Sequence, residues 1–167
     1  TLTLSLSIRE NIGLRLDESD QYTKEEADQA VEQALSEVGL ESSVLQQYPA
    51  ELSGGMQKRV GVARAIVHRP SYLIYDEPTA GLDPLNADRI DRLIAELNKT
   101  SERSSIVITH DIHSLRHLAD HIVMIHNQSI YFQGTFEELI ASEDEVLHAY
   151  IARERSYKNR LLGGGSI

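Results

Sequence analysis

The sequence has no cysteine and no tryptophan, and it is short of cationic residues. Sixteen Lys and Arg stand against 26 Asp and Glu, which gives a formal charge of −10. Without cysteine the chain can form neither a disulfide framework nor a thiolate metal site. The negative charge argues against the broad cationic surface that duplex nucleic acid or anionic lipid would require. We therefore do not expect nucleic acid as a partner.

Long apolar runs are also missing. No window approaches the roughly 18 consecutive apolar residues of a membrane span, and the first residues, TLTLSLSIRE, lack the basic and then apolar layout of a secretory signal. These absences predict a soluble chain, and the lack of cysteine fits a reducing cytosol. At 167 residues and 41% hydrophobic composition, the chain is long enough for one domain with a real core and too short for two.

The most informative absence is a glycine-rich phosphate loop. The segments LSGGMQKRV (residues 52–60) and LIYDEPTAGLD (residues 73–83) are typical of a nucleoside triphosphatase. The pattern G-x-x-x-x-G-K-[ST], which would hold the phosphates, occurs nowhere in the 167 residues. The sequence thus carries half of such a site.

Local patterns predict an α/β chain. Residues 2–8 alternate Leu and Ile with Thr and Ser, which fits either a half-buried strand or an extended lead-in to Asn11. Thr23 and Glu26 form a capping box that opens an amphipathic helix ending at Gly39. The remaining predicted elements, in order, are a helix at 54–69, a buried strand at 72–76, a helix at 85–99, a strand at 105–110, a helix at 112–119, a hairpin turning at Asn127 and Gln128, a short helix opened by Thr135 and Glu138, a charged helix at about 143–158 and a flexible tail at 159–167. Helices alternating with strands indicate parallel strands with crossovers.

Two adjacent acids, Asp76 and Glu77, end the strand YLIYD. A strand of a parallel sheet places such acids at its carboxyl edge, where α/β proteins bind ligands. One acid can hold Mg²⁺ through water, and the next can orient or deprotonate the water that attacks a γ-phosphate. His110 follows the next strand and is expected at the same edge, as a γ-phosphate contact and positioner of that water, although a structural histidine is the ordinary alternative.

Ser53, Gly54 and Gly55 open the helix at 54–69. Their backbone N–H groups can approach a phosphate at a helix N-terminus, although an ordinary N-cap is the alternative. A helix over 54–69 spans about 24 Å, whereas the returning five-residue strand recovers about 16 Å. Ser53 is therefore not expected to meet Glu77 of its own chain, and the phosphate that it touches would belong to another subunit's site. Asp83 is expected to cap the helix that begins near Leu85 and to face the subunit boundary.

Three histidines, His113, His117 and His121, lie four residues apart and suggest a metal site. We set this interpretation aside because Leu118 and Ala119 are the evident core positions and the sheet edge already explains the region.

Three segments, in this order and spacing, resemble an ATP-binding-cassette (ABC) transporter ATPase: LSGGMQKRVGVARAI its signature, LIYDEPTAGLDP its Walker B motif with D-loop, and VITHD its H-loop. The resemblance covers roughly Thr1 to Ile151. The SGGM start, the helix rich in Arg and Ala, and GTFEELIASEDEVLHAYI near the end are most similar to the ATPases of Mla/Mce-type lipid-trafficking systems.

The resemblance implies a fold and an assembly. The fold is a P-loop NTPase-like parallel sheet with flanking helices, in which residues 1–158 form the C-terminal two-thirds of one domain. Residues 11–69 would be the helical signature subdomain and residues 70–158 the core. Two cassettes, identical or not, would enclose two ATP molecules head to tail and drive transmembrane permease subunits, which would hold the ATPase at the cytoplasmic face of the membrane. The segment around Asn11 and the helix from Thr23 would face those permeases.

The resemblance also assigns roles to residues. Glu77 would be the general base, His110 the γ-phosphate contact and Asp76 the Mg²⁺ residue. Five residues would contact the partner's ATP or the interface: Ser53, Gly54, Gly55, Gln57 and Asp83. The cofactors implied are ATP and Mg²⁺.

The chain departs from the family's pattern at its start. Family members place Walker A, an adenine-stacking aromatic and the Q-loop glutamine earlier than the segment that Thr1 resembles, and none occurs here. The resemblance therefore implies an N-terminal truncation, a chain that is inactive alone, and a sheet whose exposed apolar surface favours self-association or a partner. Two alternatives stay open: a non-transport ABC protein acting on ribosomes or DNA, and a binding module that donates Ser53 and its helix to a complete partner.

Overall fold

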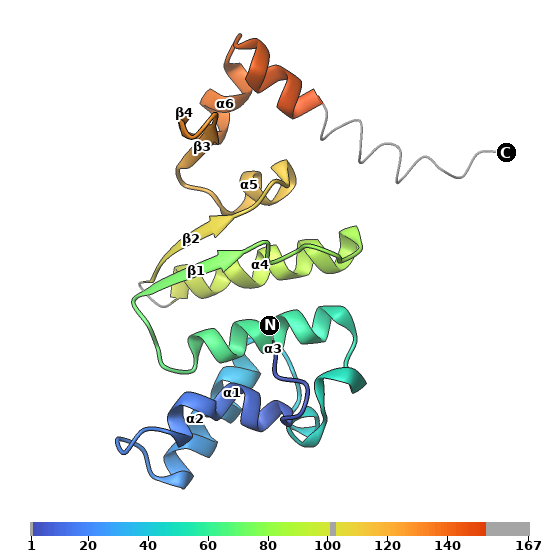
Figure 1. Ribbon diagram of the computed structural model, residues 1–167, viewed down its shortest axis with the longest axis vertical. Helices are drawn as coiled ribbons and strands as arrows, with labels where there is room; N and C mark the ends of the chain where they lie inside the picture. Colours follow the sequence, from blue (N-terminus) through green and yellow to red (C-terminus); the bar gives the residue numbers. More distant parts are fainter. Residues whose placement is uncertain (1, 101–102, 153–167) are drawn as a thin grey trace, which may run out of the picture. The chain divides into compact units, whose positions relative to one another are not determined.

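The computed structural model describes residues 2–100 and 103–152, which form two compact units divided between Ile108 and Thr109 (Figure 1). The first unit contains α1 (Ile8–Asp17), α2 (Lys24–Glu37), η1 (Ser42–Gln46), η2 (Pro49–Glu51), α3 (Gly54–Ile66), β1 (Tyr72–Asp76), α4 (Pro84–Thr100) and β2 (Ser104–Ile108). The second unit contains α5 (Ile112–Leu118), β3 (Ile122–His126), β4 (Ser129–Gly134), α6 (Phe136–Ala141) and a helical stretch at residues 145–152. No helix within these described ranges is long and apolar enough to cross a bilayer.

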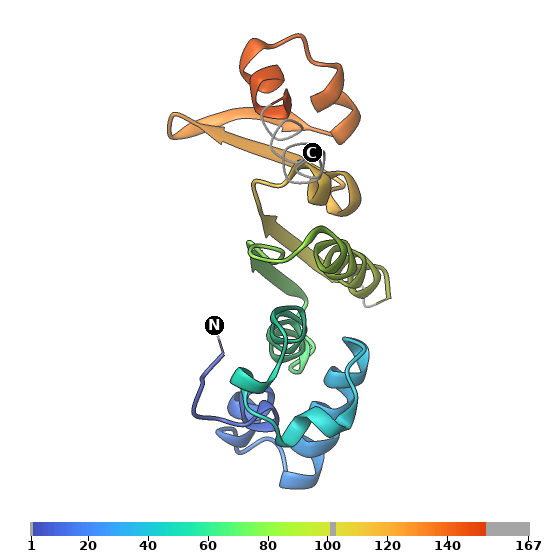
Figure 2. The same ribbon diagram turned by 90° about the vertical axis from the view of Figure 1, so that its right-hand side faces the viewer.

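Strands β1 and β2 pair in parallel, which confirms the α/β class. Their register runs from Tyr72 opposite Ser104 to Asp76 opposite Ile108. Parallel neighbours need a long crossover connection, and α4 supplies it, lying along the strand pair (Figure 2). The amide of Asn98 on α4 donates a 2.7 Å hydrogen bond to the Ser105 hydroxyl, so α4 covers the face that carries Ser105 and its register partner Leu73.

The opposite face of this strand pair is apolar and exposed in the part of the chain that the structure describes. We call it the open sheet face; its side chains are 53–79% exposed and belong to Tyr72, Ile74, Ile106 and Ile108. The alternation of strand residues puts these four on one side, while Leu73 and Tyr75 are buried on the other. The strand at 72–76, which the sequence predicts to be buried, is thus buried on one face only. The expected exposure of apolar sheet surface is confirmed.

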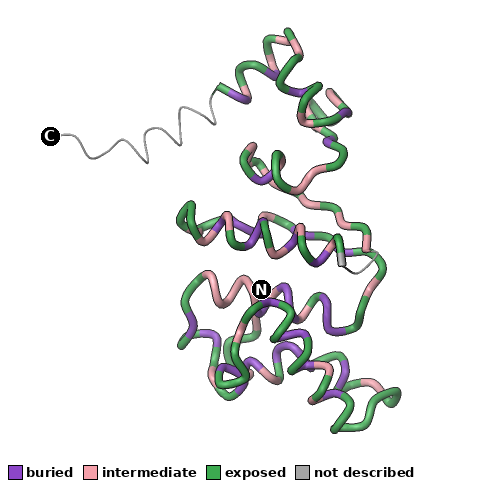
Figure 3. The backbone as a smooth tube through the Cα atoms, turned by 180° about the vertical axis from the view of Figure 1, so that it is seen from behind, coloured by how far each residue is buried: buried purple, intermediate pink, exposed green. Residues whose placement is uncertain are grey.

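Helices α1, α2 and α3 pack together around an apolar core. Figure 3 shows buried positions recurring along each of these helices, and among them Ile12, Val31 and Val60 are almost fully buried. The guanidinium of Arg9 on α1 pairs with Asp17 and, at 2.6 Å, with Asp28 of α2. The capping box of Thr23 and Glu26 opens α2 as predicted.

The first residues fold differently from both sequence expectations. A turn over residues 4–6 leads into α1, which begins three residues before Asn11, so the strand alternative is wrong and the lead-in is shorter than expected. Ser7 caps the helix: its hydroxyl accepts a hydrogen bond from the Glu10 N–H, and the Glu10 carboxylate accepts one from the Ser7 N–H at 2.7 Å. The residues of this capping box can be read from the sequence, but the alternation of Leu and Ile before them favours a strand.

The second unit is built on the predicted hairpin. Strands β3 and β4 pair antiparallel, and Asn127 and Gln128 turn the chain with φ values of 49° and 61°, as a tight hairpin turn requires. Thr135 and Glu138 form the capping box predicted for α6. The helix predicted at about 143–158 begins two residues later, at 145, and is described as far as 152; its predicted residues 153–158 and the predicted tail at 159–167 lie outside the described residues.

Asn11 holds the turn before α1 in place, and its replacement should destabilise the fold. Its side chain is 1% exposed; the carbonyl accepts from the Thr3 N–H at 2.7 Å, and the amide donates to the carbonyls of Thr3, Leu6 and Ser7, each at 3.0 Å. Asn11→Ala removes these four part-buried hydrogen bonds, which should lower the free energy of unfolding by about 2 kcal/mol. Denaturant titration checks this, with the exposed Gln46→Ala as control. Equal unfolding midpoints for the two variants would contradict the assignment.

Candidate nucleotide site

The two acids lie where the sequence predicts. Asp76 is the last residue of β1 and is exposed, and Glu77 follows it, half-buried. The Glu77 N–H donates a 2.9 Å hydrogen bond to the Ile108 carbonyl at the end of β2. Both acids therefore lie at the carboxyl edge of the parallel pair, which is the usual ligand-binding edge of an α/β sheet.

Glu77 has a left-handed backbone conformation, with φ of 46°. That conformation costs a residue other than glycine roughly 1–2 kcal/mol, so its surroundings must maintain it. The Glu77 carbonyl accepts two hydrogen bonds, one from the Ala80 N–H at 3.2 Å and one from Lys58 Nζ of α3 at 3.1 Å. The turn after the acids is thus held both locally and from the signature helix.

Asp83 closes this turn and opens α4. Its carboxylate accepts hydrogen bonds from the N–H groups of Leu85 and Asn86, both at 3.1 Å, and from the Asn86 side-chain amide at 2.5 Å. The hydrogen bond from the Asn86 side chain, followed by those from backbone N–H groups, lowers the pKa of the Asp83 carboxyl. The predicted N-cap is confirmed, and the role of Asp83 at a subunit boundary stays a prediction.

The signature segment forms an exposed helix start. Ser53 is the N-cap of α3, and its hydroxyl accepts a 3.3 Å hydrogen bond from the Met56 N–H. A methyl group added at Gly54 would lie 3.6 Å from the Leu82 side chain, and one at Gly55 would lie 3.5 Å from Asn86. These are ordinary contact distances, so packing among the described residues does not require glycine at either position. They also place the start of α3 beside the loop that follows Glu77; the predicted separation of Ser53 from Glu77 stays a prediction.

The Gln57 side chain forms hydrogen bonds within its own chain. Its side-chain amide donates to the carbonyls of Pro49 at 2.9 Å and of Leu52 at 3.2 Å. These bonds tie α3 to the turn that precedes it and so fix the approach to Ser53. A contact between Gln57 and a partner's ATP stays a prediction.

His110 belongs to the second unit, two residues after β2 ends. Its side chain is exposed, and its backbone carbonyl accepts a 2.8 Å hydrogen bond from the Tyr150 hydroxyl. This bond ties the segment after β2 to the helical stretch at residues 145–152. The role of His110 at a γ-phosphate stays a prediction.

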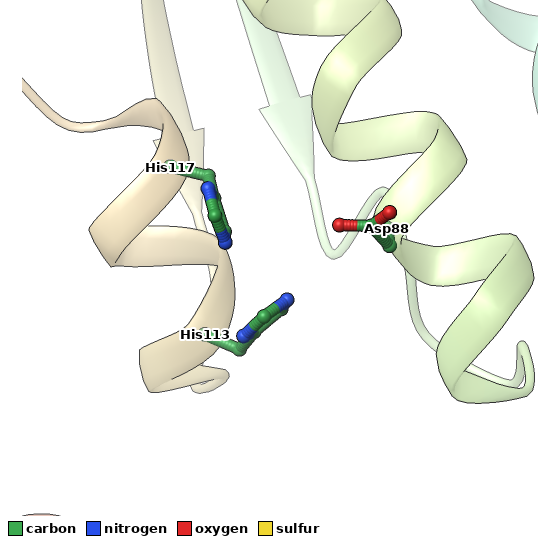
Figure 4. A group of neighbouring side chains, drawn as sticks. All are labelled: Asp88, His113 and His117. Carbon is green, nitrogen blue, oxygen red and sulfur yellow. The ribbon is translucent and has the colours of Figure 1, made fainter.

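Two of the spaced histidines meet on α5. The rings of His113 and His117 lie edge to face with centroids 4.6 Å apart (Figure 4). Figure 4 also draws Asp88, which belongs to α4 of the first unit, where it pairs with Arg92 at 3.0 Å. Two imidazoles from one short helix do not complete a metal site, because zinc sites in proteins use three or four ligands.

Two further residues of this region were not singled out from the sequence. Lys58 reaches Glu77 across 19 positions of the chain, and Asn86 holds Asp83. Asn86 could have been found as the third residue after an N-cap aspartate. Lys58 has no local signal, because its contact depends on how α3 packs against the sheet edge.

Comparisons with known sequences agree with the cassette features. The ABC transporter family matches residues 1–80. Protein TRIGALACTOSYLDIACYLGLYCEROL 3, chloroplastic, of Arabidopsis thaliana is 33% identical over 162 residues, which cover 87% of this chain and 47% of that protein. Energy-coupling factor transporter ATP-binding protein EcfA2 of Bacillus cereus is 37% identical over 122 residues, which cover 73% of this chain and 42% of that protein. The chain thus spans less than half the length of these relatives.

Solved structures agree as well. The protein cbiO1 from Clostridium perfringens, part of the ABC transporter complex cbiONQ, superimposes with a TM-score of 0.76 at 28% identity, over 96% of this chain and 59% of that one. A dimeric ATP-binding cassette in a post-hydrolysis state, bound to ADP and Pi, superimposes with a TM-score of 0.71 at 28% identity. The superposition covers 81% of this chain and 59% of that one. The fold is that of an ATP-binding cassette. By sequence and fold, the chain is related to the ATPase domains of ABC transporters.

The cap formed by Asp83 should depend on pH. Because its folded-state pKa is lowered, the charged cap stabilises the fold above the unfolded-state pKa, and this stabilisation is lost as the pH falls through the folded-state pKa. Asp83→Ala should therefore lower the melting temperature at pH 7 and should lower it less at pH 3. Circular dichroism melts at both pH values measure this, with the exposed Asp20→Ala as control. A melting-temperature difference of equal size at both pH values would contradict the charged cap.

Proposed function

We propose that residues 1–167 supply the signature, Walker B and H-loop parts of an ATP-binding cassette that hydrolyses ATP in a head-to-tail dimer. The observation that carries this proposal is the pair Asp76 and Glu77 at the carboxyl edge of a parallel strand pair. The relative EcfA2 of Bacillus cereus supports it, because it is named as a transporter ATP-binding protein.

The residues at this edge suit phosphate-bond hydrolysis. Asp76 is exposed and would hold Mg²⁺ through water, an ion that would supply neutralisation of the phosphate charge. Glu77 is the general base for the attacking water, since a positioned carboxylate can take its proton. His110 contacts the γ-phosphate and helps to position that water.

The signature segment acts on the nucleotide of the partner subunit. Ser53 and Gly54 are exposed at the N-terminus of α3, where backbone N–H groups and the helix dipole favour an anion. Since the described residues leave ordinary contact distances for a methyl group at 54 and 55, close approach by an outside group accounts for glycine at both positions. Asp83, exposed at the start of α4, contributes to the same interface, as does Gln57 through its support of the loop before Ser53.

A complete nucleotide site needs a phosphate loop that these 167 residues do not contain. We propose that polypeptide outside them supplies it, so that residues 1–167 alone do not hydrolyse ATP. The assembled ATPase is this sequence together with the polypeptide that carries the phosphate loop.

The proposal extends from ATP hydrolysis to a role in transport. The assembled ATPase drives permease subunits and is held by them at the cytoplasmic face of the membrane, as the complex cbiONQ named for one structural neighbour suggests. A lipid or another hydrophobic molecule is the proposed substrate. The resemblance of the SGGM segment to lipid-trafficking ATPases supports it, as does the relative from Arabidopsis thaliana, which is named after a glycolipid.

Glu77→Gln in the assembled ATPase should retain ATP binding and lose turnover at least ~100-fold, because the amide cannot accept the proton of the attacking water. Steady-state phosphate release and binding of a fluorescent ATP analogue measure the two properties separately. Glu18→Gln, an exposed carboxylate distant in sequence, is the matched control. Turnover of Glu77→Gln at the unsubstituted rate would overturn the base assignment.

Gly55→Ala and Gly61→Ala form a matched pair on α3. An added methyl group meets only ordinary contacts at Gly55 and open space at Gly61, so both variants should be as stable as the unsubstituted protein or more so, by up to about 1 kcal/mol. Only Gly55→Ala should lower ATPase activity, because the methyl group intrudes where the partner's phosphate approaches. Equal activity of the two variants would mean that no phosphate comes close to Gly55.

A further inference from the structure

Lys58 connects α3, the helix that begins with the signature segment, to the turn that follows Asp76 and Glu77. It lies five residues after the N-cap Ser53, with a half-buried side chain, and its Nζ donates a 3.1 Å hydrogen bond to the Glu77 backbone carbonyl. This contact joins two positions 19 residues apart, and both lie in the first compact unit.

The Glu77 backbone needs such support. Its left-handed φ of 46° is maintained by the hydrogen bond of its N–H to Ile108 and by those that its carbonyl accepts from Ala80 and Lys58. The first two come from the neighbouring strand and from the turn itself. The third is donated by the ammonium group of Lys58 on α3. Charge-assisted hydrogen bonds of this kind are roughly twice as strong as neutral ones.

Helix α3 also meets the far side of the same turn. Gly54 lies beside Leu82, and Gly55 lies beside Asn86, the residue that holds Asp83. The first turns of α3 therefore contact the chain at Glu77 and again five to nine residues later. Because a helix moves as a rigid element, a displacement at Ser53 is passed to Lys58.

We propose that Lys58 is a positioning residue for Glu77, which sets the backbone of the general base and links it to the occupancy of the signature segment. The inference rests on the proposed function, since it takes Glu77 as the base and residues 53–55 as the contact of the partner's phosphate. The orientation of the peptide after Glu77 is coupled to the direction of its side chain. When the partner's phosphate binds at residues 53–55 and fixes the position of α3, Lys58 holds the Glu77 carboxylate in the position for hydrolysis.

The first experiment tests the contact in the 167-residue chain. Carbon-13 NMR follows the Glu77 carbonyl in the unsubstituted protein, in Lys58→Met and in Lys58→Arg. Loss of the hydrogen bond in Lys58→Met should move this resonance upfield and speed hydrogen exchange of the Ala80 amide, and Lys58→Arg should preserve both signals. An unchanged Glu77 resonance in Lys58→Met would overturn the proposal.

The second experiment tests the role in the assembled ATPase. Lys58→Met should lower kcat at least ~10-fold and leave the KM for ATP within about twofold, and Lys58→Arg should recover most of kcat. Arg64→Met removes another cationic side chain from the same helix and should leave kcat unchanged. If Lys58→Met does not fold, as its melting curve will show, Lys58→Gln replaces it in both experiments.

The outcomes separate the inference from the function on which it rests. If the unsubstituted assembled ATPase does not hydrolyse ATP, the proposed function fails whatever Lys58 does. If Glu77→Gln hydrolyses ATP at the normal rate, the assignment of Glu77 as the base fails, and the positioning role falls with it. If Glu77→Gln is inactive and Lys58→Met keeps a normal kcat, only the positioning role is overturned. A rise in KM with unchanged kcat would also overturn it, because Lys58 would then act on nucleotide binding.

Discussion

Parallel pairing of β1 with β2 is the constraint on which the rest of the first unit depends. Parallel strands cannot be joined by a tight turn, so the chain must cross over through α4. The same pairing ends both strands at one edge, and there the Glu77 N–H is held by the Ile108 carbonyl. The acids, their turn and the capped start of α4 therefore occupy one short region because of how two strands align.

The turn at this edge combines strain with support from distant residues. A left-handed glutamate is unfavourable alone, and strained residues of this kind cluster at functional sites. Its backbone donates a hydrogen bond to β2 and accepts hydrogen bonds from the turn and from α3. The conformation of the acid is thus a property of tertiary structure, and the helix that begins with the signature segment takes part in maintaining it.

Much of the fold could be predicted because its signals are local. Capping boxes at Thr23 and Thr135, the turn at Asn127 and Gln128, and the acids after an apolar strand each act within a few residues. The same kind of signal occurs at Ser7, but the alternating Leu and Ile in front of it favour a strand. Contacts between distant elements left no such pattern: Lys58 meets Glu77, and Gln57 meets Pro49, only once α3 has packed.

The open sheet face gives the chain a second determinant of stability besides its own core. Tyr72, Ile74, Ile106 and Ile108 keep much of their apolar surface in water while the other side of the same strands is buried. Any polypeptide that covers this face binds the folded form and not the unfolded one, so by mass action it raises the melting temperature in proportion to the logarithm of its concentration. The apparent thermal stability of these residues is therefore a property of the mixture in which they are studied.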